Sequence, residues 1–283
     1  MPREFEITYN AKNIYDNWVY DAHWQFLIIP VENENQHEVE IEFSNTLFAN
    51  IEYSINGYGF KTLRVHPKKK FKEITFEAKF KFLKEEVDPY NFKINPDISL
   101  AYNELHNSDF KITHERFLKS TSFTTLENKQ EQLFKFDNSI SIFDNLEALN
   151  LYIFKYIKFT TGATEVGTPL KQVITKKKGV CQDFTHLFCA LSRTNGVPTR
   201  YVSGYLDQDS GYVGDSQMHA WAEAYIPEIG WKGFDPTNNI LANTNHIKVC
   251  YGKDYNDCAP LKGIIHSQGK NKTIHTVTVE SQQ

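Results

Sequence analysis

The first third of the chain alternates between hydrophobic and polar residues with a period of two. The clearest runs cover residues 5–9, 39–43 and 74–82, in which every second side chain is aromatic or aliphatic. This alternation is typical of antiparallel strands with one buried and one solvent-facing side. The dipeptide Asn56-Gly57 lies between two further strand-like runs and predicts a hairpin with a type I′ turn. A β-sandwich-like N-terminal domain is therefore expected, and we assign residues 1–125 to it.

The hydrophobic period then changes to three or four residues, which is typical of amphipathic helices. The first such helix is predicted at 142–158, with Ser141 as its N-cap. A second is predicted at 169–177, with Thr168 as cap and Pro169 at its first position. A third begins at Cys181 and ends before Asn195-Gly196, whose glycine is typical of a helix end.

Strand-like runs follow these three helices. They are predicted at 199–206, 218–226 and 231–234. Helices followed by strands favour an α+β fold, which we assign to a core at 126–283. The tail at 273–279 is expected to form one more strand, and its pattern allows it to pair with either domain.

Composition excludes several classes of function. The 283 residues carry a net charge of −4, so no basic surface for nucleic acid is expected. No run of about 18 apolar residues occurs, so no membrane span is expected. The N-terminus MPREFEITYN lacks the apolar stretch of a signal peptide, and we expect a cytoplasmic location.

Four cysteines supply the first candidate chemistry: Cys181, Cys189, Cys250 and Cys258. Their spacing contains no Cys-x-x-Cys pair, so a structural zinc site is not expected. Cys181 follows KKKGV and starts the third predicted helix, where the positive end of the helix dipole favours a thiolate. Cys181 is therefore the candidate nucleophile, and the other three thiols are expected to be inert.

A cysteine nucleophile needs a base, and the base needs a group that orients it. In MHAWAEAYIP, His219 lies on one face of a predicted strand whose other face carries three alanines suited to packing against a helix. Asp235 precedes Pro236, which favours extended backbone. A hairpin of 219–226 with 231–235 would bring Asp235 beside His219, although periodicity alone does not establish that the three side chains converge.

Two sequence blocks carry a family resemblance. GVCQDFTHLFCALSRTNGVPTRYVSGYL and MHAWAEAYIPEIGWKGFDPTN, followed by YGKDYNDCAPLKG, resemble the bacterial branch of the transglutaminase-like superfamily. The resemblance covers about residues 165–260, and the N-terminal β region looks like the small β domain that precedes the core in that branch. It implies a papain-like transglutaminase core of α+β class, preceded by an antiparallel β-sandwich-like domain.

The resemblance also implies a mechanism. Cys181 would attack an amide carbon, His219 would act as base and then acid, and Asp235 would orient His219. The thioester would then pass to water or to an amine. Animal transglutaminases use a tryptophan well upstream of the cysteine, and none lies between Trp24 and Trp221 here. This favours a cysteine protease that hydrolyses peptide or isopeptide bonds over a protein-glutamine γ-glutamyltransferase.

A third hypothesis is a catalytically silent peptide-binding module. In each case the expected partner is a protein or peptide, and neither nucleic acid nor a membrane. No cofactor and no metal are expected. Because no EF-hand loop occurs, no calcium requirement is predicted. The oligomeric state is not predicted. The polar segment 207–217 ends just before His219 and is a candidate lip over the site, or an ordinary surface loop.

Overall fold

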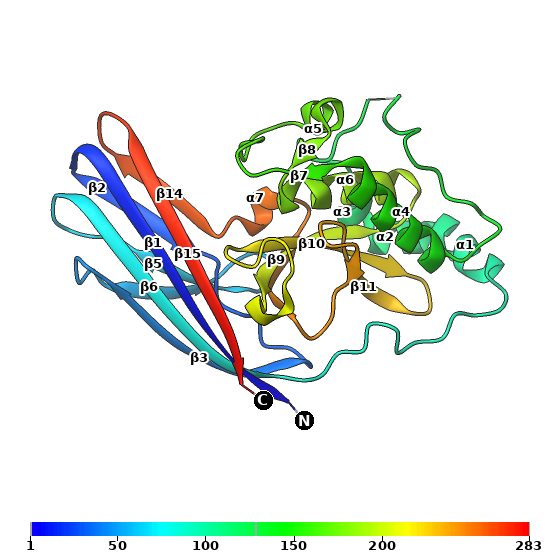
Figure 1. Cartoon of the computed structure of the whole chain (residues 1–283), viewed down its shortest axis with the longest axis horizontal. Coiled ribbons are helices and arrows are strands. Elements are labelled where there is room, and N and C mark those ends of the chain that lie inside the picture. Colours follow the sequence, from blue (N-terminus) through cyan, green and yellow to red (C-terminus); the bar gives the residue numbers. More distant parts are fainter. Residues whose placement is uncertain (1, 128, 283) are drawn as a thin grey trace.

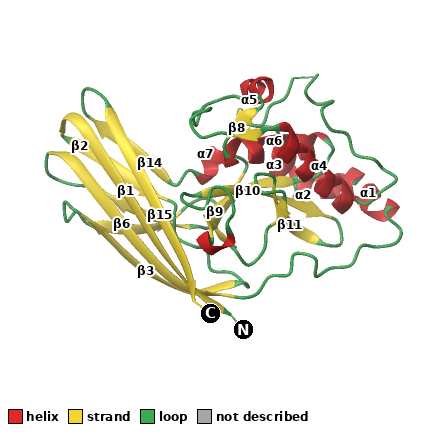
Figure 2. Cartoon of the chain, in the orientation of Figure 1, coloured by secondary structure: helices red, strands yellow, loops and turns green. Residues whose placement is uncertain are grey.

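The computed structural model describes residues 2–127 and 129–282, which form a β-sandwich beside an α+β core (Figures 1 and 2). The sandwich consists of two antiparallel sheets in the orders β15-β1-β6-β3 and β14-β2-β5-β4. Alternate residues of each long strand point inward, which buries Phe5 and Ile7 of one strand beside Phe82 and Phe80 of another. The strands are β1 (Arg3–Val19), β2 (Asp21–Phe26), β3 (Gln36–Asn45), β4 (Ile51–Ile55), β5 (Lys61–Val65), β6 (Phe71–Lys84), β14 (Leu261–His266) and β15 (Asn271–Gln282).

The C-terminal strands belong to the sandwich and not to the core. β15 pairs with β1 from Tyr15↔Asn271 to Glu4↔Gln282, and β14 pairs with β2. The predicted division into 1–125 and 126–283 is corrected here, because residues 261–282 complete the N-terminal sheets. Without them β1 and β2 would be edge strands with unpaired backbone groups. The alternating pattern of residues 273–279 predicted a strand, but it did not indicate which strand this one pairs with.

A five-stranded antiparallel sheet, in the order β12-β11-β10-β9-β13, forms the centre of the core. Helix α6 packs on the face of β10 that carries Ala220, Ala222 and Ala224, as the small side chains on that face predicted. α4 lies beside α6 (Figure 1). The elements are α4 (Ile142–Tyr156), α5 (Leu170–Lys176), α6 (Cys181–Thr194), α7 (Tyr255–Cys258), β7 (Lys158–Phe159), β8 (Lys178–Gly179), β9 (Thr199–Leu206), β10 (His219–Ile226), β11 (Gly230–Asp235), β12 (Ile240–Leu241), β13 (His246–Gly252) and the 3-10 turn η1 (Gln208–Ser210).

Three short helices were not predicted. They are α1 (Ser99–His106), α2 (Ser108–Thr113) and α3 (Glu115–Leu118), within a stretch that has no clean hydrophobic period. The rings of Phe110 and Phe117 contact Tyr225 and Trp231, so these helices pack on the core. The first segment of the sandwich therefore ends at Lys84, well before the predicted boundary at 125.

Most local predictions agree with the structure, and two differ in detail. Ser141 caps α4 by accepting the backbone N–H of Asp144. Pro169, and not Thr168, is the N-cap of α5. β4 and β5 are joined by a five-residue loop with a positive φ at Gly59, so the Asn56-Gly57 pair does not form the two-residue turn. None of the helices in 2–127 and 129–282 combines the length and apolarity needed to cross a bilayer.

Candidate active site

Cys181 is the first residue of α6, as its position after a glycine predicted. The turn before it is held by Asp183, whose Oδ2 accepts the N–H of Val180 at 2.8 Å and the hydroxyl of Thr164 at 2.6 Å. A Cβ on Gly179 would lie 2.7 Å from the Cβ of Asp183, so a glycine is required there. Cys181 is partly exposed, whereas the other three cysteines are buried.

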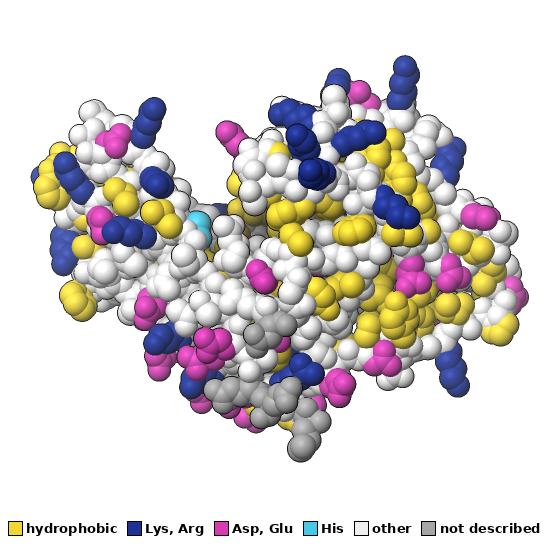
Figure 3. Space-filling view, in the orientation of Figure 1, with side chains coloured by type: hydrophobic (Ala, Val, Ile, Leu, Met, Phe, Trp, Pro, Cys, Tyr) yellow, Lys and Arg dark blue, Asp and Glu magenta, His cyan; other side chains and the backbone are white. Residues whose placement is uncertain are grey.

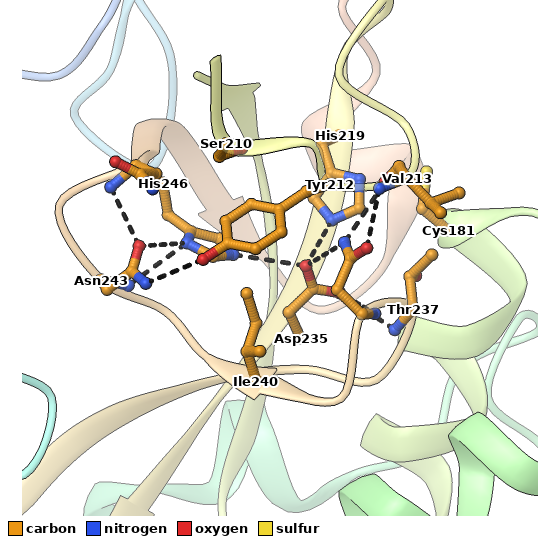
Figure 4. A network of polar contacts seen from close by, with 12 residues as sticks. Cys181, Ser210, Tyr212, Val213, His219, Asp235, Thr237, Ile240, Asn243 and His246 are labelled. Atoms are coloured by element: carbon orange, nitrogen blue, oxygen red, sulfur yellow. Dashed lines mark hydrogen bonds and ion pairs between the residues drawn. The ribbon is translucent and has the colours of Figure 1, made fainter. Parts of the chain in front are cut away.

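His219 and Asp235 meet across the β10–β11 hairpin that the sequence predicted. His219 begins β10 and Asp235 ends β11, and the imidazole Nε2–H donates to the carboxylate Oδ2 at 2.9 Å. Both side chains are fully buried. Figure 4 shows Asp235 between the imidazoles of His219 and His246, with Cys181 on the far side of His219. The three predicted residues therefore lie in one region of the molecule.

Several donors surround the Asp235 carboxylate. Its Oδ1 accepts the backbone N–H groups of Thr237 at 2.9 Å and Asn238 at 3.3 Å. Its Oδ2 also accepts Asn238 Nδ2 at 2.8 Å and His246 Nε2 at 3.3 Å. Burial raises the pKa of Asp235, but the positive charge of His219 and these hydrogen bonds outweigh it and hold the pKa far below its usual range. The carboxylate therefore stays ionised.

The other imidazole nitrogen of His219 is available for chemistry. Burial lowers the pKa of His219, but Asp235 and then Cys181 outweigh it and raise the pKa to about 10. Within the described ranges Nδ1 has no hydrogen-bond partner of standard geometry. Because the thiol of Cys181 contributes to the raised pKa, the sulfur lies near this imidazole. The Nδ1 of His219 can therefore exchange a proton with a group that lies beside it in the cavity.

Sequence reasoning did not find His246 or Asn238. His246 is buried, accepts the backbone N–H of Asn243 at Nδ1 (3.2 Å) and presents Nε2 to Asp235. Burial lowers the pKa of His246 despite the nearby carboxylate. His246 begins β13, which pairs with β9 and not with β11, so no local spacing indicated its contact with Asp235. Asn238 follows the Asp-Pro turn. Asparagine is common in turns, so its presence there gave no signal of a contact with Asp235.

Cys181 and His219 line a cavity of about 600 Å³ between the core and the sandwich. Figure 3 shows the surface hollowed between these two parts. One wall is formed by the sandwich side chains Tyr9, Trp24 and Ile265. The described lining residues include no Lys, Arg, Asp or Glu. Trp24, which is far upstream of Cys181 in sequence, thus reaches the site through the tertiary structure.

The segment 207–217 borders the same cavity, through Gly214, Ser216 and Gln217. Gly214 has a φ of +94°, and a Cβ there would lie 2.8 Å from His219 Nδ1. Asn238 ties this segment to the site, because its amide exchanges hydrogen bonds with the backbone of Val213 and also donates to Asp235. The segment predicted as a lip is therefore part of the wall around His219.

Comparisons with known proteins show what part of the chain resembles. The sequence profile of the transglutaminase-like superfamily matches residues 134–236, which include all three predicted site residues. A protein from Mycobacterium tuberculosis is 39% identical over 130 residues, and one from Mycobacterium leprae is 42% identical over 118 residues. These matches cover 42% and 40% of this chain, and 41% and 40% of the respective relatives. The chain thus spans about two fifths of the length of these relatives.

A protein-glutamine γ-glutamyltransferase from Pseudomonas aeruginosa is 30% identical over 70 residues, which is 23% of this chain and 10% of that protein. Among solved structures, a proposed cysteine protease from Cytophaga hutchinsonii superposes with a TM-score of 0.78. It is 21% identical, and the match covers 100% of this chain and 92% of the other, so it shows that the two share a fold. The chain therefore carries a domain of the transglutaminase-like superfamily, joined to a β-sandwich in a known two-part fold.

Proposed function

We propose that this protein is a cysteine-dependent enzyme that cleaves peptide or isopeptide bonds through a Cys181-His219-Asp235 triad. The observation that carries the proposal is the buried hydrogen bond between His219 and Asp235. The other imidazole nitrogen of His219 has no partner among the described residues, and His219 lines the same cavity as the partly exposed thiol of Cys181. Superfamily membership supports it, since such proteins are usually cysteine-dependent enzymes. The substrate is proposed to be a protein or peptide.

The proposed reaction begins with the Cys181 thiolate. Its sulfur attacks the amide carbon and forms a tetrahedral oxyanion, which the backbone N–H of Cys181 at the start of α6 stabilises. The imidazolium of His219 then gives its proton to the departing amine, and a thioester remains. Water attacks the thioester while His219 takes its proton, which releases the acid and restores the thiol. Asp235 keeps the imidazole oriented and stabilises its charge.

A protein-glutamine γ-glutamyltransferase uses the same first half-reaction and differs in the second. The relative from Pseudomonas aeruginosa bears that name, so the alternative is kept as a second candidate. In this case a primary amine, and not water, would take the acyl group from Cys181. The cavity is open to solvent at the boundary between core and sandwich (Figure 3), which suits water as the acceptor.

One experiment separates the candidates. The protein is incubated with a mixed peptide pool and a labelled primary amine, and the products are identified by mass spectrometry. New peptide termini that disappear in Cys181→Ala support hydrolysis. Incorporation of the amine in excess of hydrolysis would replace the protease with the transferase. If the Cys181→Ala protein acts as the unmodified chain does, both enzyme proposals are wrong and a peptide-binding module takes their place.

A further inference from the structure

The wall that the sandwich contributes to the cavity has a distinct chemistry. Tyr9, Trp24, Leu261, Ile265 and Val277 come from four strands of the two sheets and present aromatic and aliphatic surface. None of the described residues around the cavity is Lys, Arg, Asp or Glu. A charged substrate side chain placed there would lose its hydration and gain no counter-charge, which is costly.

The same wall carries the polar side chains of Asn13, Thr273 and His275, and the His275 ring is hydrogen-bonded to the hydroxyl of Tyr9. The hydroxyl of Thr273 donates to Asn13 Oδ1 at 2.7 Å, and both residues line the cavity. Asn13 is 3% exposed, and its Nδ2 has no partner among the described residues. An unpaired buried donor costs about 1–3 kcal/mol, so an acceptor on a ligand would be bound favourably there. A peptide carbonyl oxygen is such an acceptor.

From this chemistry we propose that the sandwich wall is a substrate subsite. It takes an uncharged, bulky apolar or aromatic side chain, and Asn13 Nδ2 donates to a carbonyl oxygen of the same peptide. This proposal rests on the proposed function, since it assumes that Cys181 is the attacking group in the cavity. It gives the sandwich a direct role in choosing the substrate.

The test uses chloroacetyl-dipeptide amides that alkylate Cys181 and differ only in one side chain: Phe, Leu, Lys or Glu. The rate of Cys181 labelling is measured by mass spectrometry, so no natural substrate is needed. The unmodified protein is expected to favour the Phe and Leu probes at least tenfold over the charged ones. Asn13→Ala is expected to slow the Phe probe severalfold while leaving the rate with iodoacetamide, which is too small to reach the wall, unchanged.

A charge placed on the wall should change the preference. Ile265→Glu is expected to favour the Lys probe over the Glu probe, because Ile265 lines the cavity. Its neighbour Ile264 is 68% exposed and is not among the lining residues, so Ile264→Glu is the matched control. Equal rates for all four probes, or the same change in both variants, would overturn the subsite. Failure of iodoacetamide to label Cys181 faster than the buried cysteines would instead count against the proposed function.

A second, independent inference concerns the exposed face of the sandwich at the ends of β2 and β14. Three of the ten histidines gather around one carboxylate: His23 on β2, His66 just after β5 and His266 at the end of β14, with Asp21 at the start of β2. His66 Nε2 lies 2.9 Å and His23 Nε2 3.5 Å from Asp21 Oδ1, and His266 Nε2 lies 4.0 Å from Oδ2. The strand register places Asp21 directly opposite His266.

The ring nitrogens of His23 and His66 converge with a carboxylate oxygen of Asp21, and His266 approaches the same carboxylate from β14. The rings of His23 and His66 stack with centroids 3.8 Å apart, and the ligand atoms of Asp21, His23 and His66 lie within 4.8 Å of one another. Donor atoms around a tetrahedral zinc ion, bound at about 2.0–2.1 Å, are separated by about 3.3 Å. Three imidazoles and one carboxylate are a donor set that zinc prefers. The cysteine spacing, which argued against zinc, does not bear on this cluster.

The cluster of Asp21, His23, His66 and His266 is, we infer, a binding site for Zn²⁺ or a similar divalent transition metal. The metal would join β2, β14 and the end of β5, and so fix the last hairpin of the chain to the first. Figure 1 shows the β2 and β14 tips at the end of the sandwich away from the core, so the metal has a structural role and not a catalytic one. Binding to the folded state alone raises stability.

The test uses Cys181→Ala protein, which removes the reactive thiol as a competing ligand. Zn²⁺ is titrated by calorimetry, and Co²⁺ is added to look for the strong visible absorption of tetrahedral coordination. One equivalent of metal and a higher melting temperature are expected. Asp21→Ala and His66→Ala should each weaken Zn²⁺ binding at least tenfold. His37→Ala is the matched control, because His37 lies 3.5 Å from Glu85 in a lone histidine–carboxylate pair. Binding that is unchanged in the Asp21 and His66 variants, or equally weakened in the control, would overturn the inference.

Discussion

Replacing Asp235 with asparagine removes one charge and keeps the shape of the side chain. In the intact protein the pKa of His219 is raised from 6.5 to about 10, chiefly by Asp235 once the opposing effect of burial is overcome. A difference of about 3.5 in pKa corresponds to about 5 kcal/mol in favour of the imidazolium. Cys181 contributes part of this stabilisation, so Asp235 alone accounts for less than the total. We therefore expect peptide turnover at neutral pH to fall by about 10²- to 10³-fold in Asp235→Asn.

The assay follows alkylation of Cys181 by limiting iodoacetamide as a function of pH, read out by mass spectrometry. In the intact protein the pKa of His219 is raised to about 10, so the imidazole beside Cys181 is protonated at neutral pH. In Asp235→Asn the imidazolium loses its partner and the pKa of His219 falls, so the positive charge beside the sulfur is lost at neutral pH and the alkylation curve is expected to shift. Asn238→Ala is the control, because it removes a neutral donor from the same carboxylate and leaves its charge intact. An alkylation midpoint and a turnover rate that are the same in Asp235→Asn and the intact protein would refute the reasoning.

Three further predictions follow from the site and its surroundings. His246→Phe should lower turnover about tenfold, because it removes one donor to Asp235. His246→Gln should retain most of the turnover of the intact protein, as measured by steady-state kinetics. Equal losses in both variants would contradict a positioning role. Gly214→Ala should abolish turnover and also lower the melting temperature, because a φ of +94° strains an alanine and the added Cβ would meet His219 Nδ1. An active variant would contradict this. Lys84→Met should stabilise the protein against urea below pH 7 by at most about 5 kcal/mol, because burial lowers the pKa of Lys84 from 10.5 to about 7. The buried charged amine destabilises the folded state by its full amount below pH 7, and this destabilisation disappears as the pH rises to 10.5. A gain in unfolding free energy for Lys84→Met that does not shrink with rising pH would contradict that reasoning.

Local elements of this chain are determined by its sequence. The two-residue period of β1 and β6, the Ser141 cap of α4 and the alanine face of β10 each follow from interactions between near neighbours. The three site residues were also predicted, because a helix start, a strand start and an Asp-Pro turn place Cys181, His219 and Asp235 in recognisable local settings. The β10–β11 hairpin then brings two of them together, His219 and Asp235.

Tertiary structure alone decided which distant segments meet. An edge strand accepts any partner with free backbone groups, so the pattern of β15 did not reveal that it pairs with β1. His246 contacts Asp235 although two strands separate β13 from β11 in the sheet, and Trp24 lines the cavity because the sandwich lies against the core. Such contacts depend on packing between elements that are far apart in the chain. They cannot be predicted from the hydrophobic period or the residue spacing within any one segment. The sequence therefore indicated the candidate site residues, whereas the tertiary structure determined the second histidine on the carboxylate and the wall that faces Cys181.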